Sequence, residues 1–151
     1  MRRFQGVVLV IFLSVGLILS HGVAAAEDVV GSVKVAQGEA KIQRGAAVIP
    51  ATAGTRLFPG DVLQTGSDGQ LGVILRDDTL LSLGPDSSLE IKDFLFAPAD
   101  NHLSMVLNML HGLVSYVSGK ISKLAPDAVR IETPVGTVGV RGTRLLIRIE
   151  D

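Results

Sequence analysis

Few residues of this sequence could take part in catalysis. It contains no cysteine, and two of its three histidines, His102 and His111, lie beyond the N-terminal segment. A nucleophilic serine needs a base beside it, yet the sequence has no Gly-x-Ser-x-Gly step and no recognisable Ser/His/Asp pattern. Two scattered histidines without thiolates do not form a zinc site of ordinary type. We therefore predict no catalytic residue, no metal and no cofactor, with both histidines solvated at turns or strand ends.

Asp77 and Asp78 form an adjacent pair of carboxylates. In a strand, neighbouring side chains point to opposite faces, so the two could not share a substrate. In the segment RDDT they are turn residues that need no further function, and a glycosidase pair would need a defined separation in space. The segment GSDGQLGV at 66–73 faintly resembles a calcium-binding repeat. Such repeats work in arrays and this one occurs once, which favours a turn.

The C-terminal segment TPVGTVGVRGTRLLIRIED carries glycines at 136, 139 and 142. A phosphate-binding loop would need a lysine and then a helix, whereas the residues after Gly142 continue as a strand. We interpret the Arg141-Gly142 step as a sharp bend or bulge that restarts the chain at Thr143.

Arg141 has two interpretations at this bend. Its guanidinium carries five donors that can bond the carbonyls freed by the bend, or it can lie on a solvated outer face. An anion site formed with Arg144 and Arg148 is a further alternative, because those two share one face of an extended strand. The pattern favours the solvated face.

The elements that position these residues are short strands. Turn signals such as PGD at 59–61 and GPDSS at 84–88 recur about every 8 to 12 residues. Between them, apolar residues alternate with a period of two, as in Leu71, Val73 and Leu75, which indicates strands with one buried face. The fold class is therefore all-β, a layered roll or a β-solenoid or sandwich-like domain.

One segment, residues 103–117, has both strand and helix spacing. Its neighbours are strand-like, so we favour strand–turn–strand with the turn at Gly112, and the alternative is a helix that ends there. Residues 96–101 and 119–128 are interpreted as exposed loops.

The N-terminus predicts a signal peptide over residues 1–26, followed by one domain over 27–151. Arg2 and Arg3 precede an apolar segment, 6–19, that is shorter than the ~20 residues of a spanning helix, and small residues at Ala24 and Ala26 suggest cleavage after Ala26. We expect a periplasmic or otherwise exported protein. The alternative is an uncleaved anchor in the inner membrane, facing the periplasm, in which case this segment provides the membrane contact.

Composition excludes one partner class. Without Arg2 and Arg3, 12 of the 14 basic residues remain against 15 acidic ones, a net charge of −3. This balance gives no basis for nucleic-acid binding.

Three sequence steps, taken in order, match those of a known family. The first step is Leu57, Gly60, Asp61, Leu63 and Thr65. The second is Asp77, Asp78, Thr79, Leu81, Leu83, Pro85 and Ser87, where Asp78 replaces the glycine that is frequent in the family. The third is Thr133, Pro134, Gly136, Arg141, Gly142 and Thr143. Together they resemble the FecR domain, the periplasmic part of the ferric-citrate regulator family, and the similarity extends over about 31–149.

The resemblance implies an all-β periplasmic domain. Full family members join it to a cytoplasmic anti-sigma segment and a transmembrane helix, and relay a signal from a TonB-dependent transporter to a sigma factor. Five residues precede the apolar segment and the sequence ends directly after the motif strand, so we expect neither a cytoplasmic part nor a transporter-docking module.

We therefore expect an exported, non-enzymatic module for binding, signalling or scaffolding. Its partner would be a protein or an envelope polymer, which the last strand, 144–149, could accept by edge pairing. Charges at Arg144, Arg148, Glu150 and Asp151 could instead guard that edge. The alternatives are an accessory sensor for a separate membrane anti-sigma and transporter system in iron regulation, or a structural protein that binds a cell-envelope polymer.

Overall fold

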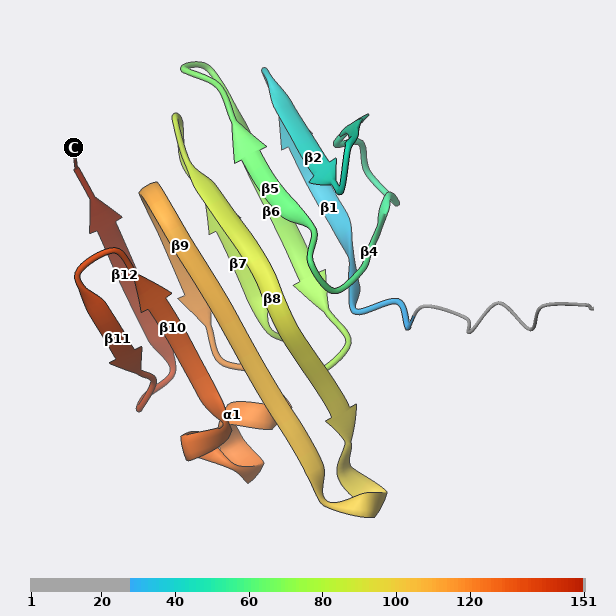
Figure 1. Ribbon diagram of the computed structural model, residues 1–151, viewed down its shortest axis with the longest axis vertical. Helices are drawn as coiled ribbons and strands as arrows, with labels where there is room; N and C mark the ends of the chain where they lie inside the picture. Colours follow the sequence, from blue (N-terminus) through green and yellow to red (C-terminus); the bar gives the residue numbers. More distant parts are fainter. Residues whose placement is uncertain (1–27, 151) are drawn as a thin grey trace, which may run out of the picture.

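A computed structural model describes residues 28–150, which form one antiparallel-rich sheet of 12 strands that curls into two layers (Figure 1). Both the predicted signal peptide and its helix lie outside these residues. The all-β prediction is confirmed. Among residues 28–150, no helix is long and apolar enough to cross a membrane.

The two layers share one strand, β9 (His102–Val117). The first layer also contains β1 (Gly31–Gln37), β4 (Arg56–Leu57), β6 (Gln70–Leu75), β7 (Leu80–Leu83) and β12 (Arg144–Ile149). The second layer contains β2 (Ala40–Arg44), β3 (Ala47–Pro50), β5 (Val62–Thr65), β8 (Ser88–Ala97), β10 (Val129–Thr133) and β11 (Gly136–Gly139). Neighbouring strands are antiparallel except for β9 and β10, which run parallel.

Strand β9 passes from one layer to the other at Gly112. Residues 102–111 pair with β8, whereas residues 112–117 pair with β12. Gly112 has φ +93°, and a Cβ atom there would lie 2.3 Å from the Ser87 Oγ, so the crossing requires glycine. The predicted strand structure is confirmed and the helix alternative is wrong. Residues 102–117 form one strand rather than two strands joined by a turn, and its two halves lie in different layers and form no hairpin (Figure 1).

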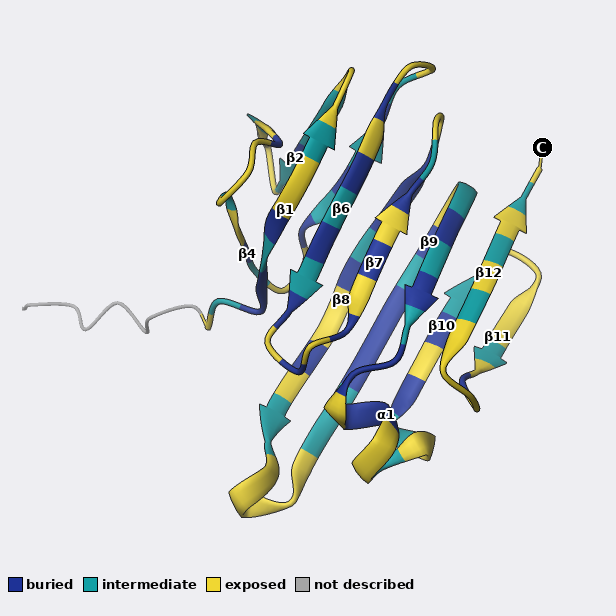
Figure 2. Ribbon diagram, turned by 180° about the vertical axis from the view of Figure 1, so that it is seen from behind, coloured by how far each residue is buried: buried dark blue, intermediate teal, exposed yellow. Residues whose placement is uncertain are grey.

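The core fills the space between the layers. Along β6, Leu71, Val73 and Leu75 are buried while the residues between them are partly exposed (Figure 2). Ile42, Leu63 and other strand residues of the second layer pack against the same core cluster. The period of two therefore marks the buried faces, as the sequence predicted.

The prediction of an exposed loop over 119–128 is wrong. These residues form α1 (Lys120–Leu124) and the short 3-10 helix η2 (Pro126–Ala128). Ile121 is fully buried and belongs to the core cluster, so one turn of helix closes this end of the two layers. The other predicted loop, 96–101, contains the 3-10 helix η1 (Pro98–Asp100), whose residues are not buried.

Candidate binding site

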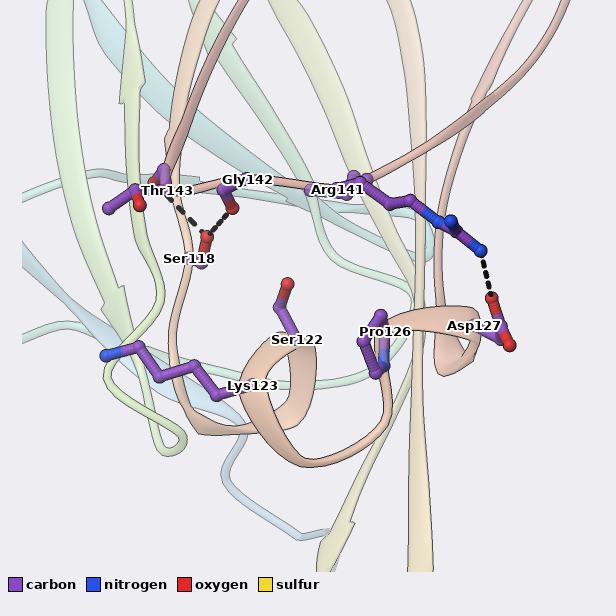
Figure 3. Close-up of a pocket in the computed structure, with 9 residues that line it drawn as sticks. Ser118, Ser122, Lys123, Pro126, Asp127, Arg141, Gly142 and Thr143 are labelled. Atoms are coloured by element: carbon purple, nitrogen blue, oxygen red, sulfur yellow. Dashed lines mark hydrogen bonds and ion pairs between the residues drawn. The ribbon is translucent and has the colours of Figure 1, made fainter.

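A cleft of about 440 Å³ lies where α1 and η2 face the bend between β11 and β12 (Figure 3). Its lining combines residues of the bend with residues of the helical segment: Ser118, Ser122, Lys123, Pro126, Asp127, Val140, Arg141, Gly142 and Thr143. Three of the motif residues predicted from the sequence, Arg141, Gly142 and Thr143, therefore border this cleft.

Ser118 fixes the bend in place. Its hydroxyl donates to the carbonyl oxygens of Gly142 and Thr143, and its amide donates to the Thr143 carbonyl at 2.9 Å. Gly142 has φ +123°, a conformation that a side chain disfavours. The carbonyls that the bend frees are thus satisfied by Ser118, a residue that the sequence did not single out.

Arg141 does not bond the carbonyls of the bend. Its side chain is 87% exposed, and its nearest charged partner is Asp127, with 3.8 Å between the Arg141 Nη2 and the Asp127 Oδ1. Arg148 lies 3.5 Å from Glu150. The structure therefore agrees with the solvated interpretation of Arg141.

Replacing Arg141 by alanine should change the free energy of unfolding by no more than about 0.5 kcal/mol. The ion pair with Asp127 is long, and both side chains are in water. Urea denaturation of the variant and of the wild type measures the difference. A loss of more than about 1 kcal/mol would show that the guanidinium makes a buried contact after all.

The lining of the cleft combines charged and hydroxyl side chains. Lys123 and Arg141 supply positive charge against the single carboxylate of Asp127, and the Ser122 hydroxyl points into the space (Figure 3). His102 and His111, both exposed as expected, lie on β9 and do not line the cleft. Among residues 28–150, no group of three or more His, Asp or Glu side chains is arranged to hold a metal ion.

Asp61, from the first motif step, lies elsewhere and is fully buried. Its carboxylate accepts two bonds from Arg44, at 2.9 and 2.8 Å, and one from the Phe58 amide at 2.9 Å. Gly60 precedes it with φ +86°. This step therefore closes a turn and ties it to β2.

Thr133, Pro134 and Gly136 form the turn between β10 and β11. The Thr133 hydroxyl donates to the Gly136 carbonyl at 2.8 Å across the turn. The eight predicted motif residues thus fall in three separate places, and a common functional role for them stays a prediction.

The model of the FecR protein family matches residues 61–151. This chain belongs to the FecR family. The match begins at Asp61, so it covers the second and third sequence steps and the end of the first. FecR domains are generally non-catalytic regulatory domains, typically parts of anti-sigma and other signalling proteins. No curated protein and no solved structure matches the chain.

In this FecR domain, the buried carboxylate of Asp77 holds the helix that forms one wall of the cleft. It accepts hydrogen bonds from the Thr79 amide, the Thr79 hydroxyl and the Ile121 amide. Its backbone carbonyl accepts a bond from the Lys120 amide. From the sequence, Asp77 is predicted to be a turn residue that needs no further function. The Asp-x-Thr spacing indicates the local turn, but the contact with α1 spans 44 positions and leaves no local signal.

Tyr116, the one tyrosine of the chain, neighbours Thr79 and Ser122 of α1. It is fully buried, and within residues 28–150 its hydroxyl has no hydrogen-bond partner. Burial raises the pKa of the Tyr116 phenol, while the neighbouring Ser122 and Thr79 side chains oppose that rise.

Replacing Tyr116 by phenylalanine should leave the stability at neutral pH unchanged or higher, because an unsatisfied buried hydroxyl is removed. Because the folded pKa is raised, the unfolded chain releases the phenolic proton first, and the wild type should lose stability as the pH rises past about 10. The Tyr116→Phe variant should lose less stability over the same rise in pH. Urea midpoints at pH 7 and pH 10.5 test both statements, and an equal alkaline loss in the two proteins would contradict the second.

The FecR domain also leaves one edge of the first layer open, at β12. This strand pairs with β9, and within residues 28–150 no strand pairs with its other side. Its inward side chains, Leu145, Ile147 and Ile149, are only partly buried against the core, and Leu146 is 66% exposed on the outer face. The two layers are therefore incompletely closed along this edge.

Proposed function

We propose that this chain is an exported, non-enzymatic FecR-like module that works in the periplasm and binds a protein partner for signalling or scaffolding. Family membership supports the regulatory class, and the N-terminal segment supports export. The observation that carries the binding role is the open β12 edge, which exposes unpaired backbone and half-buried apolar side chains together. A partner strand added there would satisfy the backbone and cover those side chains.

The hydrogen-bond pattern shows which backbone groups are free for such a partner. The Ser118 amide donates to the Thr143 carbonyl, so this opposite pair is hydrogen-bonded. Antiparallel ladders alternate between bonded and non-bonded pairs. The backbone groups of Leu145, Ile147 and Ile149 therefore face β9, while those of Leu146 and its outward-facing neighbours face the open side.

Proline at two adjacent positions should distinguish partner binding from folding. Leu146→Pro removes one outward amide and keeps the ladder with β9, whereas Ile147→Pro removes an inward amide and should destabilise the domain. Leu146→Val keeps the amide and serves as the matched control. In a crosslinking capture from envelope extract, we expect wild type and Leu146→Val to retain the same partner and Leu146→Pro to lose it. Equal capture by a folded Leu146→Pro variant would refute the edge as the binding site.

The exported state has its own test. A C-terminal alkaline phosphatase fusion should be active, because that enzyme needs the oxidising periplasm for its disulfides. The intact mass of the purified protein should show cleavage after Ala26. An inactive fusion, expressed at the same level, would refute export.

A further inference from the structure

We propose that one occupant of the open β12 edge is a second copy of this chain, whose β12 pairs antiparallel with the first in one register. This inference rests on the proposed role of the edge in binding. A two-fold axis would relate the copies, so each contact would occur twice. The side-chain pairs that this strand can form with itself select the register.

The open-side backbone groups limit the possible registers. Bonded pairs between the copies must join the outward positions of β12, which are 144, 146 and 148, because their amides and carbonyls face the open side. Glu150 follows the end of the strand and takes the next outward position if the alternation continues. Registers in which an outward position meets an inward one would leave these groups unpaired.

Among the permitted registers, the one that places Leu146 opposite its own copy is unfavourable. It sets Arg144 directly opposite Arg148 at both ends, and like charges in directly opposite positions destabilise a strand pair. It also places the apolar Ile149 opposite the polar Thr143 of the bend. Moving the copies by two residues in one direction shortens the pairing, since Arg148 then lies opposite Gly142 in the bend.

Moving the copies by two residues in the other direction satisfies both charge and apolar pairing. Arg144 then lies opposite Glu150 of the copy, and this ion pair forms twice. The two-fold axis passes between the two Ile147 residues, which lie opposite each other. Leu145 of each copy lies opposite Ile149 of the other copy. These inward positions are non-bonded pairs on the new edge, in which opposite side chains approach most closely. All three partly buried side chains of β12 would thus be covered by apolar partners.

The side chains that select this register are accessible in the structure. Arg144 is exposed on β12 and Glu150 is exposed directly after its end, so changing them should not disturb the core. Arg148 and Glu150 are 64% and 76% exposed, respectively, and their 3.5 Å contact is a surface pair that is worth little to stability. Exposed arginines on an edge strand disfavour pairing with other strands. Such pairing would remain favourable only in a register that places each arginine away from another arginine.

Sedimentation equilibrium of the exported protein, purified from the cell envelope, tests the inference. We expect a reversible monomer–dimer equilibrium. Arg144→Glu places a glutamate opposite Glu150 of the copy, and Glu150→Arg places an arginine opposite Arg144. Each change removes two attractions and adds two repulsions, so each should weaken dimerisation about tenfold at low salt. The double variant R144E/E150R should recover most of the loss, and high salt should reduce all these differences.

A wild-type protein that stays monomeric at all accessible concentrations overturns the inference. A dimer that both single charge changes leave unaffected overturns it too, as does a double variant no better than the singles. These failures are distinct from failure of the proposed function. A monomeric protein that captures a partner through the wild-type edge, but not as Leu146→Pro, would keep the binding role and remove only the second copy.

Discussion

An Asp77→Ala variant is expected to lose about 3–5 kcal/mol of unfolding free energy. The carboxylate is fully buried and accepts from three donors, namely the Thr79 amide and hydroxyl and the Ile121 amide. Removing it leaves those donors buried without a partner, and each unsatisfied group costs about 1–3 kcal/mol. Guanidinium chloride denaturation monitored by circular dichroism measures the loss.

Asp78 provides the control, because it is the adjacent carboxylate with a different environment. Its side chain is 60% exposed and pairs with Lys120 at 2.9 Å in water. Asp78→Asn keeps a residue that tolerates its positive φ of +68°, so it should change stability by less than about 0.5 kcal/mol. Equal losses at the two positions would contradict the assignment of Asp77 as the buried anchor.

The same contact connects stability to the cleft. Asp77 binds the first turn of α1, and α1 carries Ser122 and Lys123 into the lining. Loss of the carboxylate should therefore loosen one wall of the cleft although Asp77 does not line it. Amide hydrogen exchange of residues 120–124 should rise in Asp77→Ala under conditions where the strands stay protected.

Local patterns predicted the strands and turns of this domain because their causes are local. The turns predicted at 59–61 and 84–88 contain Gly60 with φ +86° and Asp86 with φ +48°, a conformation that glycine and aspartate tolerate. The alternation along β6 followed directly from one buried face. These features need no knowledge of distant partners.

The arrangement of layers could not be predicted in the same way. A hairpin and a crossing between layers favour the same residues, so the glycine at 112 predicted a turn, whereas the structure has one strand that changes layers there. The need for glycine at 112 comes from Ser87 and Asp86, which have atoms within 2.5 Å of the position that a Cβ atom would take. Helix α1 is a single turn, too short for helical periodicity to appear.

The candidate site was predicted in part. The Arg141-Gly142 bend was found from its glycine, but the residue that fixes it, Ser118, lies 24 positions away in sequence from Gly142. Asp61 was predicted within the PGD turn, but its partner Arg44 lies 17 positions away in sequence. A pattern in one sequence shows how a residue affects its own backbone conformation. It does not show which distant residue the fold brings into contact with it.

The Arg44–Asp61 pair gives the second large effect that we expect. Asp61 has a side chain only 1% exposed, and Arg44 is 32% exposed. Arg44→Met removes both bonds from the guanidinium to the carboxylate and leaves a buried charge with the Phe58 amide alone. We expect a loss of about 2–4 kcal/mol, toward the lower part of the range for broken buried pairs because water can reach the vacated position. Urea denaturation measures it.

Arg44 also donates to the Arg56 carbonyl at 2.9 Å and lies over the Phe58 ring, and further variants separate the ion pair from the ring contact. The guanidinium carbon lies 4.5 Å from the centre of the Phe58 ring, an interaction worth about 0.5–1 kcal/mol near the surface. Phe58→Leu should therefore cost less than Arg44→Met. A double-mutant cycle combines Arg44→Met with Asp61→Ala. The loss of unfolding free energy in the double variant should be about 1–3 kcal/mol smaller than the sum of the two single losses, because Asp61→Ala removes the charge that Arg44→Met leaves unpaired. Additive losses would mean that the two side chains act independently, and the turn at Gly60 would then need another explanation.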